Sequence, residues 1–151
     1  MARSHNKIVL IGEAGRYEEG KLAAVTDCVP GMAAELLAAG TYDQQAEAVG
    51  EAIKSELVLF TEDSLNGGKS VDDALESGQN GVPLWICGKG DVVNVLVKNA
   101  EDIDVGDYLV VEGGGSGLFV EAAGTESRYQ LKAVEGPGSL GANTLVACRV
   151  L

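Results

Sequence analysis

Six short apolar runs follow one another from residue 82 to the end of the chain. The runs are VPLWIC, DVVNVLVK, DYLVVE, GLFVEA, YQLKAV and TLVACRVL. Turn sequences rich in glycine separate them, among them residues 88–90, 113–117 and 135–138. Strands repeating every 8 to 12 residues or so, with no helical pattern between them, are typical of a β-barrel or sandwich. We therefore expect a mainly β fold, a compact β-barrel or β-tulip-like domain.

The first half of the chain adds one strand and one or two short helices to this prediction. Leu57 to Phe60 form a continuous apolar run bounded by charge, which indicates a buried strand. The segment SVDDALESG begins with Ser70 and carries Asp73 three residues later, a capping pattern, and Gly78 offers a C-terminal stop. It predicts a short helix. Residues 43–54 fit either one or two helical turns or a polar loop.

The N-terminus predicts an extended arm. A polar start is followed by the apolar KIVLI and then by GEAGRYEEGK, which has the composition of a loop. A lone strand of five residues does not bury itself, so unless it pairs inside its own fold it is suited to a neighbour's sheet edge. Residues 1–11 carry Arg3 and Lys7 and no acid, whereas the remaining 140 have a balance of −14. We expect an arm and tether over 1–22 and a β-rich domain over 23–151.

Charge and composition argue against several classes of partner. The net charge of −12 disfavours nucleic acid, because phosphate binding needs clustered Lys and Arg. No stretch approaches the roughly 18 consecutive apolar residues of a membrane span, so we expect synthesis and use without membrane crossing.

The three cysteines are Cys28, Cys87 and Cys148, an odd number without a C-x-x-C pair. We expect them to be reduced and mostly buried.

Two fragments resemble a phosphate-binding loop, and each is incomplete. Residues 15–21 satisfy G-x-x-x-x-G-K, but Leu22 stands where a magnesium-binding hydroxyl is needed, and Glu18 and Glu19 would repel a triphosphate. Residues 66–70, NGGKS, end correctly, but Asp63 occupies the position of the first glycine. We interpret the first fragment as a flexible linker and the second as a polar turn, and expect no cofactor.

The chain also lacks the patterns of common catalytic and metal sites. The acids Asp102, Asp104 and Asp107 suggest a calcium loop, but its sixth and twelfth positions hold Asp107 and Gly113 instead of glycine and glutamate. We expect a turn with Ile103 and Val105 pointing inward; a weak structural cation there stays open. The only histidine is His5, so no Ser-His-Asp or Cys-His constellation is expected in a rigid body. The chain is not expected to be an enzyme.

Four segments resemble the head decoration, or capsid cement, proteins of tailed phages. They are VPGMAAELLAAGTY, FTEDSLNGGKSVDDALESG, GDVVNVLVKNAEDIDVGDYLVVEGGGSGLFVEA and TLVACRVL, which lie between about residue 29 and residue 151. The resemblance implies a β-rich domain that assembles, usually as a trimer, on the outside of an icosahedral capsid. It also implies an N-terminal arm that lies across the major capsid protein.

The resulting expectation is a virion protein on the capsid exterior, made in the host cytoplasm, that bridges subunits of the major capsid protein at threefold positions as a homotrimer. Its binding residues would be those of the arm, with Arg3 and Arg16 as ion-pair donors: Arg3, Lys7, Ile8, Val9, Leu10, Ile11 and Arg16. Deleting residues 1–13 should then abolish binding and leave a folded body. Two alternatives stay open: a tail-tube or fibre-base module, and a β-clip domain that handles a small anionic or sugar-like ligand through the glycine loops at 113–117 and 136–141.

Overall fold

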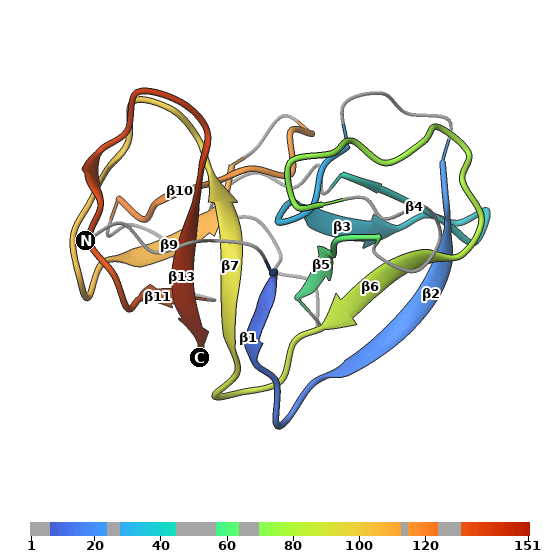
Figure 1. Cartoon of the computed structure of the whole chain (residues 1–151), viewed down its shortest axis with the longest axis horizontal. Helices are drawn as coiled ribbons and strands as arrows, with labels where there is room; N and C mark the ends of the chain where they lie inside the picture. The colour runs from blue at the N-terminus through green and yellow to red at the C-terminus, as the bar shows by residue number, and fades with distance from the viewer. Residues whose placement is uncertain (1–6, 24–27, 45–56, 64–69, 113–114, 124–130) are drawn as a thin grey trace.

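The computed structural model describes residues 7–23, 28–44, 57–63, 70–112, 115–123 and 131–151. These residues form thirteen strands arranged as two lobes side by side (Figure 1). The strands are β1 Val9–Ile11, β2 Arg16–Leu22, β3 Ala33–Leu36, β4 Thr41–Gln44, β5 Val58–Phe60, β6 Val82–Ile86, β7 Val92–Val97, β8 Asp102–Ile103, β9 Tyr108–Val111, β10 Phe119–Glu121, β11 Leu131–Ala133, β12 Gly138–Ser139 and β13 Thr144–Val150. The mainly β, barrel-like fold predicted from the sequence is confirmed.

The first lobe is a closed barrel in the order β2-β4-β3-β5-β6, called here the first barrel. The position of strand β5 explains why residues 57–60 are all apolar. Val58 and Phe60 point into the barrel core, whereas Leu59 belongs to the neighbouring core of the other lobe. Because successive side chains of a strand face opposite sides, a strand buried on both faces carries no polar position.

The second lobe is a six-stranded sheet in the order β1-β7-β10-β9-β11-β13. An additional antiparallel pairing of β7 with β13, from Thr144 opposite Val97 to Arg149 opposite Val92, closes five of these strands into a ring, called here the second barrel. Val93, Val95 and Val97 alternate along β7 and are fully buried in its core. The strand β1 lies at the end of this sheet, between the two lobes (Figure 1).

Two glycines with positive φ bring the backbones of the two barrels into contact. At Gly31 (φ +91°) the carbonyl oxygen accepts a hydrogen bond from Leu96 N at 2.9 Å. At Gly117 (φ +69°) the carbonyl oxygen accepts one from Ala33 N, also at 2.9 Å. A side chain at Gly31 would collide with Leu145, so this approach requires glycine for its space and for its backbone conformation.

The strands expected from the apolar runs are all present: β1, β5, β6, β7, β9, β10, β11 and β13. Three longer strands of the first barrel, β2, β3 and β4, were not predicted. Their sequences RYEEGKL, AAEL and TYDQ are polar or rich in alanine, because much of their surface faces solvent. Pairing within the barrel, and not intrinsic preference, makes these segments strands.

The predicted short helix over SVDDALESG is wrong, since the described residues contain turns there. The local capping contacts do form: Ser70 N donates to Asp73 Oδ2 at 2.8 Å, and Asp72 N donates to Ser70 Oγ at 3.3 Å. The helix does not continue because Leu75 N donates to Cys28 O at 2.8 Å, which fixes the buried Leu75 side chain against the first barrel. Of the other helical candidate, Asp43 and Gln44 belong to β4, and 45–54 lies outside the described residues.

The acidic turn after β8 differs from the prediction at one side chain. Ile103 is fully buried as expected, but Val105 is 70% exposed and does not point inward. The cause is a tight turn in which Asp104 N donates to Asp107 Oδ2 at 2.7 Å and Gly106 takes a φ of +98°. This turn places Val105 at its exposed apex.

Replacing Gly15 with alanine should destabilise the fold by about 2 kcal/mol, as overpacking typically does. A Cβ at this position would clash with the Ile86 carbonyl oxygen and lie 2.5 Å from Asp91 Oδ2. Gly141→Ala is the control, because a Cβ there meets nothing within 4 Å. Urea unfolding of both variants tests this, and equal stabilities would show that the chain relaxes around residue 15 without cost.

Candidate functional site

The predicted arm residues from Lys7 to Ile11 lie within the fold. The strand β1 pairs antiparallel with β7, Val9 opposite Val93 and Ile11 opposite Val92. Residues 16–20 of the expected tether pair with β6. An extended arm is therefore wrong for residues 7–22, because β1 pairs with β7 and β2 pairs with β6 of the same chain. Arg3 and the rest of 1–6 lie outside the described residues.

The side chains of this strand separate into a buried and an exposed set. Ile8 is fully buried in the core of the second barrel, and the partly buried Val9 packs against the same core. Leu10 is 40% exposed and Ile11 51% exposed, and Lys7 is also exposed. Among these five candidate residues, Lys7, Leu10 and Ile11 are therefore the ones whose side chains a partner can contact.

The predicted residue Arg16 begins β2 and points to solvent. Its Nε lies 3.2 Å from Glu18 Oε1, an ion pair between two exposed side chains. Such surface pairs contribute little to stability, so the guanidinium can exchange this partner for another carboxylate at small cost.

The aromatic pair Tyr17 and Trp85 was not among the predicted site residues. The two residues stand opposite each other in the β2–β6 ladder, with ring centroids 4.7 Å apart and an interplanar angle of 71°. Tyr17 is 60% exposed, whereas Trp85 is buried beneath it. Partial burial, assisted by the nearby Glu62 carboxylate, raises the pKa of the Tyr17 hydroxyl. Reading residues 16–22 as a strand would have been the signal for this pair.

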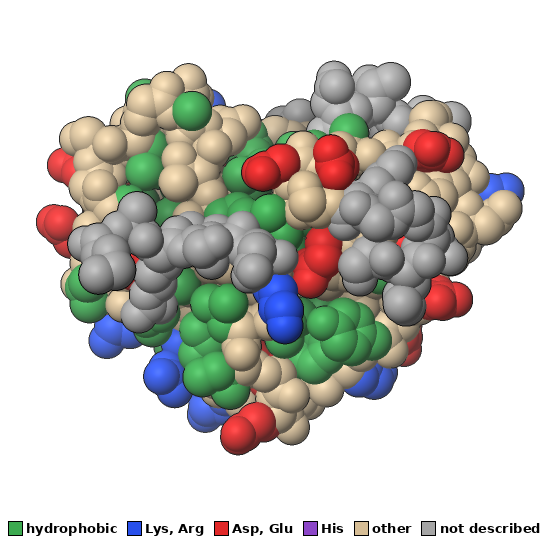
Figure 2. All heavy atoms as spheres, in the orientation of Figure 1, with side chains coloured by type: hydrophobic (Ala, Val, Ile, Leu, Met, Phe, Trp, Pro, Cys, Tyr) green, Lys and Arg blue, Asp and Glu red, His purple; other side chains and the backbone are tan. Residues whose placement is uncertain are grey.

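The exposed side chains of β1, of Lys7 just before it and of the start of β2 are grouped here under the name β1–β2 surface. Its members are Lys7, Leu10, Ile11, Arg16 and Tyr17. Gly12 connects the two strands, and a Cβ there would touch both Val9 and the Trp85 ring, so the strands approach closely at this point. Hydrophobic side chains gather in this region of the molecule, over β1 and β7 and again over β6 (Figure 2). The surface combines apolar contact area with basic groups.

The buried carboxylate of Asp91 holds this surface in place. It is 1% exposed and accepts four hydrogen bonds, from Glu13 N at 3.0 Å, Ala14 N at 2.9 Å, Trp85 Nε1 at 3.1 Å and Gly88 N at 2.9 Å. Burial alone would raise the pKa of the Asp91 carboxyl, but these donors outweigh it and leave the pKa below its ordinary value. The carboxylate thus fixes the β1–β2 turn and the Trp85 ring together.

The G-x-x-x-x-G-K fragment is a strand and not a phosphate loop. Residues 16–20 pair with β6, so most of the backbone of this fragment belongs to the β2–β6 ladder. The interpretation as a flexible linker is therefore wrong, although the segment does not have the loop geometry of a nucleotide site either. The second fragment, NGGKS, lies outside the described residues except for Ser70.

In the acidic turn at 102–107, the Asp107 carboxylate is engaged within the turn itself. Asp104 N and the Asp107 side chain are hydrogen-bonded to each other, as described above. No cluster of three or more His, Cys, Asp or Glu side chains with metal-binding geometry occurs in the part of the chain that the structure describes. The neighbouring Glu121 carboxyl has a raised pKa because it is partly desolvated and lies near four acids, Asp107 first among them.

The three cysteines are free thiols, as predicted, and Cys28 and Cys148 are buried whereas Cys87 is half-buried. Burial, with Asp43 nearby, raises the pKa of Cys28 to about 12. Burial likewise raises the pKa values of Cys87 and Cys148. Thiols that stay protonated at neutral pH are poor nucleophiles.

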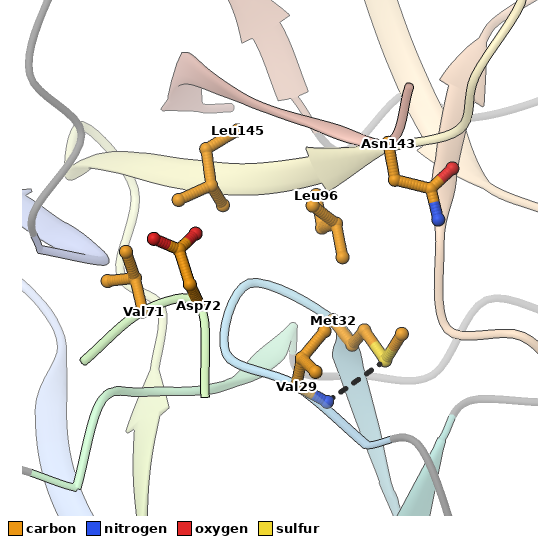
Figure 3. A pocket seen from close by; sticks show the side chains of 7 residues that line it. All are labelled: Val29, Met32, Val71, Asp72, Leu96, Asn143 and Leu145. Atoms are coloured by element: carbon orange, nitrogen blue, oxygen red, sulfur yellow. Dashed lines mark hydrogen bonds between the residues drawn. The ribbon is translucent and has the colours of Figure 1, made fainter. Parts of the chain in front are cut away.

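A cavity of about 350 Å³ lies apart from this surface, at the junction of the two barrels (Figure 3). Five apolar and two polar side chains line it: Val29, Met32, Val71, Asp72, Leu96, Asn143 and Leu145. The described parts of the two glycine loops, 115–117 and 136–141, contribute no lining residue to it. The cavity was not predicted, because its walls come from four distant segments of the sequence.

Comparison of the chain with protein-family models and with curated proteins gave no match. Within the described residues, no helix has the length and apolar character needed to cross a membrane.

Asp91→Asn should destabilise the protein by about 3 kcal/mol at pH 7, because a charged acceptor of several buried hydrogen bonds is lost. The folded pKa of Asp91 is depressed, so its contribution is fully present above the unfolded value near 4 and is lost as pH falls through the folded value. The stability difference between wild type and variant should therefore shrink below about pH 4. Urea unfolding at several pH values measures it.

Asp102→Asn is the matched control for this variant. Because the Asp102 side chain is exposed, this substitution should change stability little at any pH. A difference between wild type and Asp91→Asn that stays constant down to pH 2 would contradict an ionised Asp91.

Proposed function

We propose that this chain is a structural virion protein that binds the outer surface of a phage capsid and bridges neighbouring subunits of the major capsid protein. The observation that carries the proposal is the β1–β2 surface, in which exposed apolar side chains and two basic groups lie on or just before strands that pair with β7 and β6. The sequence resemblance to capsid cement proteins supports the same conclusion. The protein would act by binding alone, without catalysis.

The position of Leu10, Ile11 and Tyr17 suits a binding surface because the backbone beneath them is already ordered. Ile11 pairs with β7 and Tyr17 with β6. A partner that contacts them therefore loses little free energy to ordering this protein on binding. Repetition around a shell then adds avidity to contacts of modest individual strength.

The charge distribution supports a division of roles on this surface. The chain as a whole is acidic, with a net charge of −12, whereas Lys7 and Arg16 place two basic groups on the β1–β2 surface, where Glu18 pairs with Arg16 and Glu62 lies near Tyr17. Basic groups beside an apolar centre would pair with carboxylates at the rim of the contact and set its orientation. The acidic remainder would disfavour contact with the packaged nucleic acid.

The deletion of residues 1–13 no longer separates binding from folding. It would remove Ile8 from the core of the second barrel and the Glu13 N–H from the Asp91 carboxylate. Loss of binding after that deletion would therefore follow from either cause, and point variants at exposed positions are needed instead.

Ile11→Asp should weaken binding to capsid shells at least about tenfold, because it places a charge within an apolar contact. Val105→Asp is the matched control, since Val105 is 70% exposed and lies in the turn after β8, outside β1 and β2. Co-sedimentation of each variant with shells of the phage that encodes the chain measures binding, and urea unfolding checks that both stay folded. Undiminished binding of Ile11→Asp would exclude the β1–β2 surface as the contact.

The location of the protein on the particle distinguishes the capsid proposal from a tail-tube or fibre-base module. Electron micrographs of particles with and without the protein should differ by protrusions at the threefold positions of the head. Density confined to the tail would overturn the capsid proposal.

Self-association as a homotrimer is part of the proposal and rests on the resemblance. The exposed apolar side chains outside the β1–β2 surface, such as Leu36 and Tyr108, offer contact area between copies. Light scattering should give three times the chain mass of 15.6 kDa, in solution or after addition to shells. A strict monomer under both conditions would contradict the trimer.

A further inference from the structure

The cavity between the barrels combines an apolar interior with an exposed carboxylate. Met32, Val71 and Leu145 are each less than 10% exposed and form its walls, and Leu96 lies between them. The Asp72 carboxylate points into the space from one side, and the Asn143 amide nitrogen is directed into it from another (Figure 3). The cavity therefore presents one acidic group and one donor around a surface of methyl and methylene groups.

Among the residues that the structure describes, no cationic side chain is paired with the Asp72 carboxylate. Neither a hydrogen bond nor an ion pair to its oxygens occurs among the described residues; only its backbone N–H is engaged, by Ser70 Oγ. The Asn143 amide orientation is fixed, because its Oδ1 accepts a hydrogen bond from Asn99 N at 2.9 Å and leaves Nδ2 toward the cavity.

The walls of the cavity are held by backbone hydrogen bonds between distant segments. Leu96 N donates to Gly31 O at 2.9 Å and so joins β7 to the loop before β3. Leu75 N donates to Cys28 O at 2.8 Å and so anchors the turn that carries Val71 and Asp72. A ligand would enter a preformed space and lose little free energy to reorganising it.

From this arrangement we infer that the cavity receives a lysine or arginine side chain of a partner protein. The alkyl stem would pack against Val71, Leu96 and Leu145, and the cationic head would pair with the Asp72 carboxylate, as long basic side chains do when they bury the stem and solvate the head. A carbonyl of the same partner residue would accept a hydrogen bond from Asn143 Nδ2. The negative charge of the chain favours a basic group over an acidic one.

This inference deepens the proposed function, because it names the chemistry of a partner group, but it is tested without shells. The probes are N-acetyl-lysine methylamide and N-acetyl-arginine methylamide, with N-acetyl-norleucine methylamide as the neutral control of similar stem length. NMR titrations should show both cationic probes shifting the methyl signals of Met32, Leu96 and Leu145. The norleucine probe should shift them much less.

Asp72→Asn should weaken binding of the cationic probes about fivefold, the effect of losing one partly exposed ion pair. Asp102→Asn, whose carboxylate does not line the cavity, should leave probe affinity unchanged. Binding of the lysine probe should also weaken as salt concentration rises.

Equal binding of norleucine and lysine probes, or no shifts up to the solubility limit of every probe, would overturn the inference. Shell binding by the Ile11→Asp and Val105→Asp pair is measured separately. Failure of the capsid proposal therefore leaves the probe result standing, and failure of the probes leaves the β1–β2 surface standing.

Discussion

The Asp91 carboxylate is the interaction on which the arrangement of the two barrels depends. Its four donors come from the turn between β1 and β2, from the Trp85 side chain on β6 and from the turn before β7. These are the places where the chain leaves one barrel and enters the other. Since a buried carboxylate is costly without partners, the donors and the charge stabilise each other only when both crossings are correctly formed.

Glycines where the two barrels meet also help to hold the barrels together. Gly15 and Gly88 leave space beside the Asp91 network and the Ala14 backbone, and Gly31 and Gly117 allow direct backbone hydrogen bonds between the barrels. A chain with few aromatic residues cannot fill wide gaps with large side chains. It reaches dense packing instead by bringing backbones close together, and this explains part of its high glycine content.

The second barrel could be predicted from the sequence because its strands are buried and β-branched, as in Val92 to Val97. The first barrel could not, because β2 and β4 are largely polar and become strands through pairing. The same limit applied to the site. The sequence predicted a strand near residues 7–11, but the burial of Ile8 and the contact of Tyr17 with Trp85 depend on partner strands that lie far away in the sequence. The local sequence pattern at Ser70 correctly indicated the capping hydrogen bonds, but the helix predicted to follow them does not form.

The pairing of β1 with β7 has a consequence for how the chain reaches this structure. Val9 must find Val93, and the whole first barrel lies between them in the sequence. During synthesis, residues up to 86 complete the strands of the first barrel before β7 has been made. We expect the first barrel to form early with β1 still unpaired, and the second barrel to close late, since contacts across such long separations are slow to form. The first barrel is thus inserted in the sequence between two strands that pair with each other. The segments before and after it become neighbours only when β7 has been made and Ile11 pairs with Val92.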